Sequence, residues 1–170
     1  QVTLTQANSE KQVSAQVVVN ATGVRADRVG REIAGVAEPP QVRLVKGSHI
    51  VVPRIHAGDH ALILQNEDGR VVFVLPFERK FSLIGTTDTP ITDPEREHVV
   101  DEAEVDYLLR AVAPYVKQAP GPEDVVWSFA GTRPLKDDGD NNPSSASRDY
   151  SLELSSRGDA RILTVIGGKI

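Results

Sequence analysis

The sequence contains neither cysteine nor methionine. Without cysteine the chain can form no disulfide, thiolate nucleophile or zinc–thiolate site, and it suits a reducing compartment. The missing methionine has a different meaning, because a natural chain begins with one. This chain instead begins at Gln1 inside a predicted strand and stops at Ile170, directly after a Gly-Gly-Lys loop. We therefore expect it to be a piece of a longer protein.

Long apolar runs and excess positive charge are also lacking. The longest runs, such as residues 71–75, are far shorter than the roughly 20 residues that cross a bilayer. The net charge of -5 argues against nucleic acid as the main partner, because polyanion binding needs a basic face. A small anionic ligand stays compatible with this charge, since it needs only a few convergent cations. With 39% apolar and 25% charged residues, the 170-residue chain is typical of a globular domain with a real core.

Alternating apolar residues predict strands over most of the chain, and three- and four-residue steps predict a helix in each half. Strands are expected at residues 2–4, 13–19, 42–53, 61–64, 71–77, 81–85, 125–130, 150–154 and 162–166. The first helix carries Val29, Ile33 and Val36 on one face, and the second covers residues 101–116 with acidic residues in its first turn. The pattern predicts an α+β domain: a mixed, largely antiparallel sheet with both helices packed on it.

Arg133 is the most prominent candidate for binding an anion. The strand before it is cut off by Gly131, so Arg133 is expected at the strand's end, with its backbone fixed by Pro134. Its guanidinium is a rigid fork of donors that suits a carboxylate or a phosphate. A surface arginine at the start of a loop explains the same residues equally well.

Other polar residues have weaker signals. Thr22 and Gly23 join a strand to a helix, a geometry that brings backbone N–H groups toward a ligand, although an ordinary turn explains it too. The polar loops carry histidines without metal-ligand spacing, which we interpret as surface residues: His56, His60 and His98. Three aspartates have no clustered partners and are explained by turn chemistry: Asp88, Asp137 and Asp138. We therefore expect no metal site.

Several short motifs, in order and in register, give the chain a family resemblance. They are Val17–Gly23, Lys46–Arg54, Ile84–Asp88, Trp127–Leu135, Ser147–Tyr150 and Gly167–Lys169. In this order the chain resembles the FAD-dependent respiratory glycerol-3-phosphate dehydrogenases, within the D-amino-acid-oxidase-like flavoproteins. One departure is Val24-Arg25, where many members carry Pro-Trp after the glycine.

The resemblance implies a domain arrangement. Residues 1–40 are expected to form the edge of the FAD-binding domain, and residues 41–160 the substrate-binding (cap) domain. Residues 161–170 are expected to return to the flavin as a strand and a Gly-Gly loop. The glycine-rich motif that holds the FAD pyrophosphate in the family is not in this sequence, so we expect the isolated chain to bind no FAD and to be inactive.

The resemblance also implies a reaction. The parent enzyme is expected to oxidise glycerol 3-phosphate to dihydroxyacetone phosphate by hydride transfer to FAD and to pass the electrons to a quinone. It is expected in the cytoplasm, peripherally bound to the inner face of the membrane. The alternatives are a glycerol-3-phosphate oxidase that uses oxygen and a non-catalytic binding module of the same fold.

His49 and Arg133 are the implied catalytic residues. His49 would take the proton of the C2 hydroxyl, unless it is a core or sheet-edge histidine satisfied by backbone. Arg133 would stabilise the developing alkoxide. The substrate phosphate would be bound by Arg133, Lys169 and Arg148, although Arg148 could instead form a surface ion pair with Asp149. The implied flavin contacts come from residues whose backbone can approach a flat ring closely: Thr22, Gly23, Gly167 and Gly168.

Overall fold

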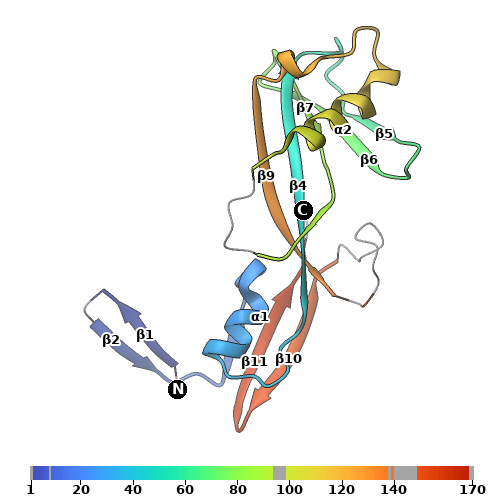
Figure 1. Cartoon of the computed structure of the whole chain (residues 1–170). Helices are drawn as coiled ribbons and strands as arrows, with labels where there is room; N and C mark the ends of the chain where they lie inside the picture. The colour runs from blue at the N-terminus through green and yellow to red at the C-terminus, as the bar shows by residue number, and fades with distance from the viewer. Residues whose placement is uncertain (1, 8, 94–98, 138, 140–148, 169–170) are drawn as a thin grey trace. The chain divides into compact units, whose positions relative to one another are not determined.

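The computed structural model describes residues 2–7, 9–93, 99–137, 139 and 149–168 (Figure 1). The chain divides into two compact units. The first unit comprises Gln1–Arg43, Pro134–Asp138 and Ser147–Ile170, and the second comprises Leu44–Arg133 and Gly139–Ala146. Residues 150–160, which we had expected with the substrate-binding domain, lie in the first unit. The assignment of the units to flavin and substrate domains stays a prediction.

The first unit contains a hairpin and a small mixed sheet. β1 (Val2–Gln6) pairs antiparallel with β2 (Ser9–Val13). β3 (Val17–Asn20) runs parallel to β11 (Ala160–Ile166), which pairs antiparallel with β10 (Ser151–Arg157). The strand predicted at residues 13–19 is thus two strands in different sheets.

The helical segment of the first unit differs from the prediction. It consists of η1 (Gly23–Arg25), α1 (Ala26–Arg28) and η2 (Val29–Ile33), which is a π-helical turn. Its buried residues are Ala26 and Gly30, whereas Ile33 is 74% exposed. The predicted face of Val29, Ile33 and Val36 is therefore wrong at Ile33. The wider i→i+5 turn rotates Ile33 away from the position that a regular α-helix would give it.

The second unit is one sheet covered on one face by a helix. The strand order is β5 (Leu62–Gln65), β6 (Val71–Phe77), β7 (Phe81–Gly85), β4 (Val42–Pro53) and β8 (Thr89–Ile91), and β9 (Trp127–Lys136) also pairs with β4. Helix α2 (Glu102–Val112) packs against the sheet, followed by the short turns η3 (Ala113–Tyr115) and η4 (Pro122–Asp124) (Figure 1). The core consists of Ile50, Val52, Leu64, Val72, Val74, Ile84, Leu108, Leu109, Ala111 and Val112. The predicted α+β class is confirmed.

Local sequence explains why α2 begins and packs as it does. The Asp101 side chain accepts a hydrogen bond from the Glu104 backbone N–H, and the Glu104 side chain accepts one from the Asp101 backbone N–H, which is a capping box. Leu108, Leu109 and Val112 are buried against the sheet, as the periodicity predicts. The helix stripe and the acidic first turn are therefore confirmed.

In β8 and β9, the strand continues through a proline at which the sequence predicts a break. β9 continues through Gly131 and Pro134, so the prediction that Arg133 stands at the end of a strand is wrong. β8 contains Pro90, which lies opposite Val45 of β4. In the described sheet each of these strands pairs with β4 alone, and a strand with a neighbour on only one side tolerates proline.

Candidate active site

His49 lies in the middle of the second unit's sheet, on the face opposite α2. It stands opposite Gly85 of β7, which in turn stands opposite Phe73 of β6. Since Val72 and Val74 pack toward α2, Phe73 and the residues in its cross-strand row point to the other face.

The imidazole of His49 is held between a ring and a bare backbone. It stacks on Phe129 of β9 with ring centroids 4.9 Å apart and planes 5° apart. A Cβ added to Gly85 would lie 2.1 Å from His49 Cδ2, so only glycine leaves room for the imidazole in this place. Neighbours on both sides therefore fix the position of this ring.

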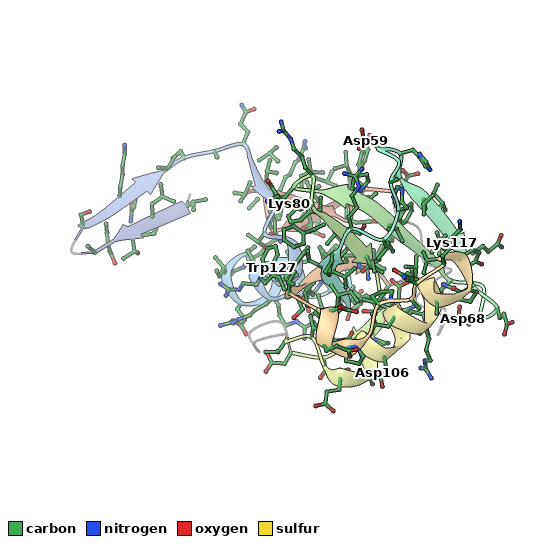
Figure 2. The ribbon with its side chains drawn as sticks, turned by 90° about the horizontal axis from the view of Figure 1, so that it is seen from above. Asp59, Asp68, Lys80, Asp106, Lys117 and Trp127 are labelled. Carbon is green, nitrogen blue, oxygen red and sulfur yellow. The ribbon has the colours of Figure 1, made fainter. Side chains whose placement is uncertain are left out.

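Aromatic side chains extend from His49 along the same strands. Trp127 lies 5.0 Å from Phe129 and 6.5 Å from Phe77, measured between ring centroids. Trp127 is 54% exposed, and Figure 2 shows it on the other side of the second unit from Asp68 and Lys117. This row of rings is an apolar border beside His49.

Arg133 is tightly held. Its Nη2 lies 2.9 Å from Asp88 Oδ1 and donates hydrogen bonds to the carbonyl oxygens of Thr87, at 2.6 Å, and Lys46, at 3.3 Å. The side chains of Arg133 and Asp88 are only 15% and 14% exposed. Arg133 is therefore not the exposed loop arginine of the alternative interpretation, and Asp88 has the charged partner that its sequence context did not reveal.

The structure brings His49 and Arg133 to neighbouring backbone segments. A Cβ on Gly47 would lie 2.6 Å from both Arg133 Nη2 and Thr86 Oγ1, just as a Cβ on Gly85 would meet His49. Two glycines, one on β4 and one at the end of β7, therefore make room for the two predicted catalytic side chains.

A buried charged network lies next to these segments. Lys46 Nζ is 2.8 Å from Glu104 Oε2 and 3.5 Å from Asp101 Oδ2, and the hydroxyls of Thr87 and Thr89 donate to Glu104 Oε1 at 2.9 Å. Lys46 and Glu104 are 7% and 6% exposed. Burial disfavours both charges, but the hydrogen bonds and the attraction between them outweigh it. The pKa of Glu104 is therefore lowered and the pKa of Lys46 is raised.

Sequence reasoning missed the role of Glu104. We interpreted it only as an acidic residue in the first turn, where it favours the helix dipole. A signal was present, because Glu104 lies four residues before Leu108, on the apolar side of the helix. A carboxylate in that position needs a buried partner.

The predicted flavin contacts gather at one edge of the first unit's sheet. β3 and β11 are parallel, with Asn20 opposite Thr164, so the loops that follow them leave the sheet at the same carboxyl edge. In open α/β sheets, ligands bind outside this edge. The loop after β3 carries Thr22 and Gly23, and the loop after β11 carries Gly167 and Gly168.

The backbone of these loops suits a closely approaching ligand. Gly23, Gly167 and Gly168 have φ values of 60°, 78° and 81°, which favour glycine. A Cβ on Gly23 would meet nothing within 4 Å, whereas one on Gly167 would lie 2.5 Å from the carbonyl oxygen of Asp149. Thr22 Oγ1 donates to Asn20 Oδ1 at 2.7 Å, which holds the first loop against the strand end. The backbone at Gly23 therefore has room for a flat cofactor, whereas the space beside Gly167 is taken by the Asp149 carbonyl oxygen.

Some predicted residues lie outside the described residues. They are Arg148, Lys169, His98 and Asp138.

Where the structure is described, no group of at least 3 histidine, aspartate or glutamate residues is arranged to hold a metal ion. His60 is exposed, while His56 is half-buried with its ring 5.2 Å from that of His60. No helix in the described ranges is long and apolar enough to cross a membrane.

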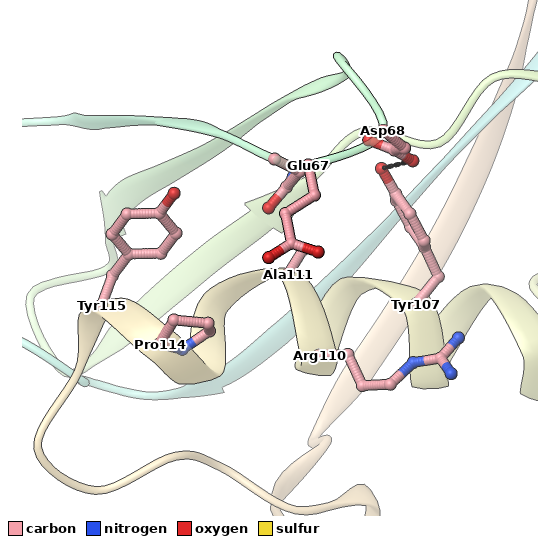
Figure 3. A pocket seen from close by; sticks show the side chains of 8 residues that line it. Glu67, Asp68, Tyr107, Arg110, Ala111, Pro114 and Tyr115 are labelled. Atoms are coloured by element: carbon pink, nitrogen blue, oxygen red, sulfur yellow. Dashed lines mark hydrogen bonds between the residues drawn. The ribbon is translucent and has the colours of Figure 1, made fainter.

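A separate hollow of about 400 Å³ lies between the β5–β6 turn and α2 (Figure 3). Tyr107 Oη donates to Asp68 Oδ2 at 3.1 Å, and Arg70 lies over the Tyr107 ring. The hollow lies on the α2 side of the sheet, whereas His49 faces the other side. The hollow is therefore not part of the site around His49.

Comparisons with known proteins find similarity to oxidoreductases. A family model described as FAD dependent oxidoreductase matches residues 1–152. A D-erythritol 1-phosphate dehydrogenase of Brucella abortus is 45% identical over 92% of this chain and 31% of its own length. The aerobic glycerol-3-phosphate dehydrogenase of Escherichia coli is 41% identical, again over 92% of this chain and 31% of its own length.

The structural comparison agrees. The glycerol-3-phosphate dehydrogenase of Bacillus halodurans, solved with FAD, matches 96% of this chain and 30% of its own chain with a TM-score of 0.69 and 27% identity. A glycine oxidase of Geobacillus kaustophilus matches with a TM-score of 0.59 and 26% identity, over 91% of this chain and 36% of its own. The chain thus spans about a third of the length of the proteins it matches.

Proposed function

Because the chain belongs to the family of FAD-dependent oxidoreductases, we propose that the protein containing it oxidises a phosphorylated polyol, first of all sn-glycerol 3-phosphate to dihydroxyacetone phosphate. The observation that carries this proposal is the placement of His49 and Arg133 around Gly47 and Gly85. The names of the curated relatives supply the substrate class.

The reaction removes a hydride from C2 and a proton from the hydroxyl on C2. FAD, when bound, supplies the hydride acceptor. His49 accepts the hydroxyl proton, a role that suits an imidazole near neutral pH. The Phe129 ring and the bare Gly85 backbone hold the imidazole in one plane, so that its nitrogens keep a fixed direction.

Arg133 supplies positive charge beside this base. It stabilises the negative charge that develops on the C2 oxygen as the proton leaves, and it contributes to binding the phosphate. Asp88 and the Thr87 carbonyl hold its guanidinium in place before substrate arrives. From the family motifs we also propose Arg148 and Lys169 as phosphate-binding residues, and both lie outside the described residues.

The cofactor would be held in part by the carboxyl edge of β3 and β11. Thr22, Gly23, Gly167 and Gly168 would present backbone to it, as the positive φ values and the open space at Gly23 allow. In keeping with the family resemblance, we propose a quinone as the electron acceptor and a peripheral position at the inner face of the cytoplasmic membrane.

A second substrate is favoured by one finding. The relative that is 45% identical to this chain is named for D-erythritol 1-phosphate, a longer polyol phosphate. Both substrates present a secondary alcohol and a phosphate ester, so the same base and the same cations serve either one.

The test uses the full-length protein that contains this chain, purified with FAD. Under anaerobic conditions the flavin absorbance should bleach on addition of glycerol 3-phosphate or D-erythritol 1-phosphate, and the faster of the two identifies the substrate. Reoxidation by a quinone analogue, compared with reoxidation by oxygen, separates the dehydrogenase from the oxidase. A flavin that neither polyol phosphate reduces would refute the proposal.

A further inference from the structure

We infer that Thr87 and Glu104 are positioning residues: through them, α2 sets the placement of Arg133 and of the backbone that carries His49. The inference rests on the proposed function, because it concerns the same two site residues. Neither Thr87 nor Glu104 has to touch the substrate for this role.

Glu104 connects four segments of the second unit through one buried carboxylate. Oε2 lies 2.8 Å from Lys46 Nζ on β4 and accepts from the Asp101 backbone at the start of α2. Oε1 accepts hydrogen bonds from Thr87, in the loop after β7, and from Thr89 on β8, both at 2.9 Å. The two oxygens therefore connect the start of α2 with β4, with the loop after β7 and with β8.

Thr87 carries this connection to the site residues. It is 2% exposed, and its hydroxyl donates to Glu104 while accepting from the backbone N–H of Ser48 at 3.0 Å. Ser48 directly precedes His49. The carbonyl oxygen of Thr87 accepts from Arg133 at 2.6 Å, and the next residue, Asp88, forms the ion pair with Arg133. One threonine is thus bonded to the helix carboxylate, to the strand before His49 and to Arg133.

Stability alone does not explain a charged pair in this place. Burying a carboxylate and an ammonium costs solvation that their attraction only partly returns, and a well-packed apolar pair is often as stable or more stable. Leu108 and Leu109 already anchor the helix through apolar contacts. The carboxylate instead fixes the orientation of the Thr87 and Thr89 hydroxyls, because both must point their O–H toward it.

Thr89 offers a matched control for Thr87. Its hydroxyl donates to the same carboxylate oxygen at the same distance. It lies on β8 opposite Lys46, and the side-chain hydrogen bond that the structure describes for it ends at Glu104. Replacing either threonine by valine exchanges its hydroxyl for a methyl group of nearly the same volume, but only the Thr87 hydroxyl also accepts from the Ser48 N–H. Thr87→Val keeps the backbone carbonyl that binds Arg133 but releases the hydroxyl contacts that fix its position.

The experiment compares Thr87→Val with Thr89→Val in the full-length protein, with glycerol 3-phosphate as substrate. We measure kcat, KM, FAD occupancy and the melting temperature. Both variants should keep FAD and melt at similarly lowered temperatures. Thr87→Val should lower kcat/KM by roughly tenfold or more, since a misplacement of about 1 Å can cost a factor of ~100. Thr89→Val should stay within about threefold of the wild type, because it leaves the bonds of the Thr87 hydroxyl to Ser48 and Glu104 in place.

A double variant separates position from stability. In the double variant Lys46→Met with Glu104→Leu, an apolar pair replaces the buried charges. Its melting temperature should be close to that of the wild type. The kcat/KM should stay low, because the hydroxyl of Thr87 has lost its acceptor. Recovery of wild-type kcat/KM in this variant would show that Glu104 is only structural and would overturn the inference.

The outcomes also distinguish the two levels of the argument. A wild-type protein that oxidises neither polyol phosphate refutes the proposed function, and the inference with it. A wild-type protein that oxidises one of them, with Thr87→Val and Thr89→Val equally active, refutes the inference alone.

Discussion

Replacing Gly85 by alanine should displace His49 and nearly abolish turnover. The added Cβ would lie 2.1 Å from His49 Cδ2 and 2.7 Å from Nε2, whereas ordinary contact begins at 3.4 Å. The imidazole would have to shift by about 1.3 Å to reach ordinary contact, and Phe129 of the neighbouring strand β9, stacked 4.9 Å away, limits that shift. Forcing a side chain off its position in a packed site costs roughly 1–3 kcal/mol of stability, which the second unit should survive.

The catalytic effect should exceed the effect on stability. A misplacement of about 1 Å in a catalytic group can lower the rate by a factor of ~100, so we expect a loss of that order in kcat for Gly85→Ala. The assay is anaerobic flavin reduction by glycerol 3-phosphate in the full-length protein, with FAD occupancy and melting temperature measured in parallel. Retention of FAD with loss of turnover is the expected result.

Gly58→Ala is the matched control. A Cβ there would lie 2.3 Å from Cε1 of His60, which is nearly the same clash with the same kind of ring. His60 is exposed in a loop and can turn away, so this variant should keep wild-type turnover. Wild-type turnover in Gly85→Ala would show that the position of His49 does not matter and would refute the reasoning.

Three further predictions concern the charged groups. Because the pKa of Glu104 is lowered, its contribution to stability is complete above the ordinary value of 4.5 and is lost as the pH falls through the lower folded value. Because the pKa of Lys46 is raised, its contribution to stability is lost only as the pH rises above about 10.5. Urea unfolding against pH should therefore show a plateau between these limits, and Glu104→Gln should flatten its acid side. Lys46→Met should cost about 3–5 kcal/mol by leaving a buried carboxylate without its cation, whereas Arg28→Ala, at a surface pair, should cost about 0.3–0.5 kcal/mol in the same unfolding assay. Arg133→Lys keeps the charge but loses the planar fork, so KM for glycerol 3-phosphate should rise roughly tenfold or more; an unchanged KM would remove Arg133 from substrate binding.

Local patterns predicted the elements whose signals lie within a few residues. The α2 stripe, its acidic cap and the turn at Asn66–Gly69 needed no distant partner to be recognised. The course of β9 and the existence of β8 depend on pairing with β4, far away in sequence, and a proline in each concealed them. The exposure of Ile33 depends on a π-helical turn, which the residue pattern did not predict.

The candidate site was predictable in its residue types but not in its connections. The family resemblance identified His49 and Arg133, and Arg133 was also a candidate because of its guanidinium and the proline that follows it. The resemblance did not show that Gly85 and Gly47 make room for these side chains, since those contacts cross from one strand to another. The Arg133–Asp88 pair joins residues 45 positions apart and needed the folded sheet to appear.

The most direct test of the account is the rate of flavin reduction in a single anaerobic turnover of the full-length protein, compared between the wild type and His49→Ala. The account predicts that glycerol 3-phosphate reduces the wild-type flavin and that His49→Ala lowers this rate by a factor of ~100 to 10,000 while FAD occupancy stays the same. An unchanged rate of reduction in His49→Ala would contradict it.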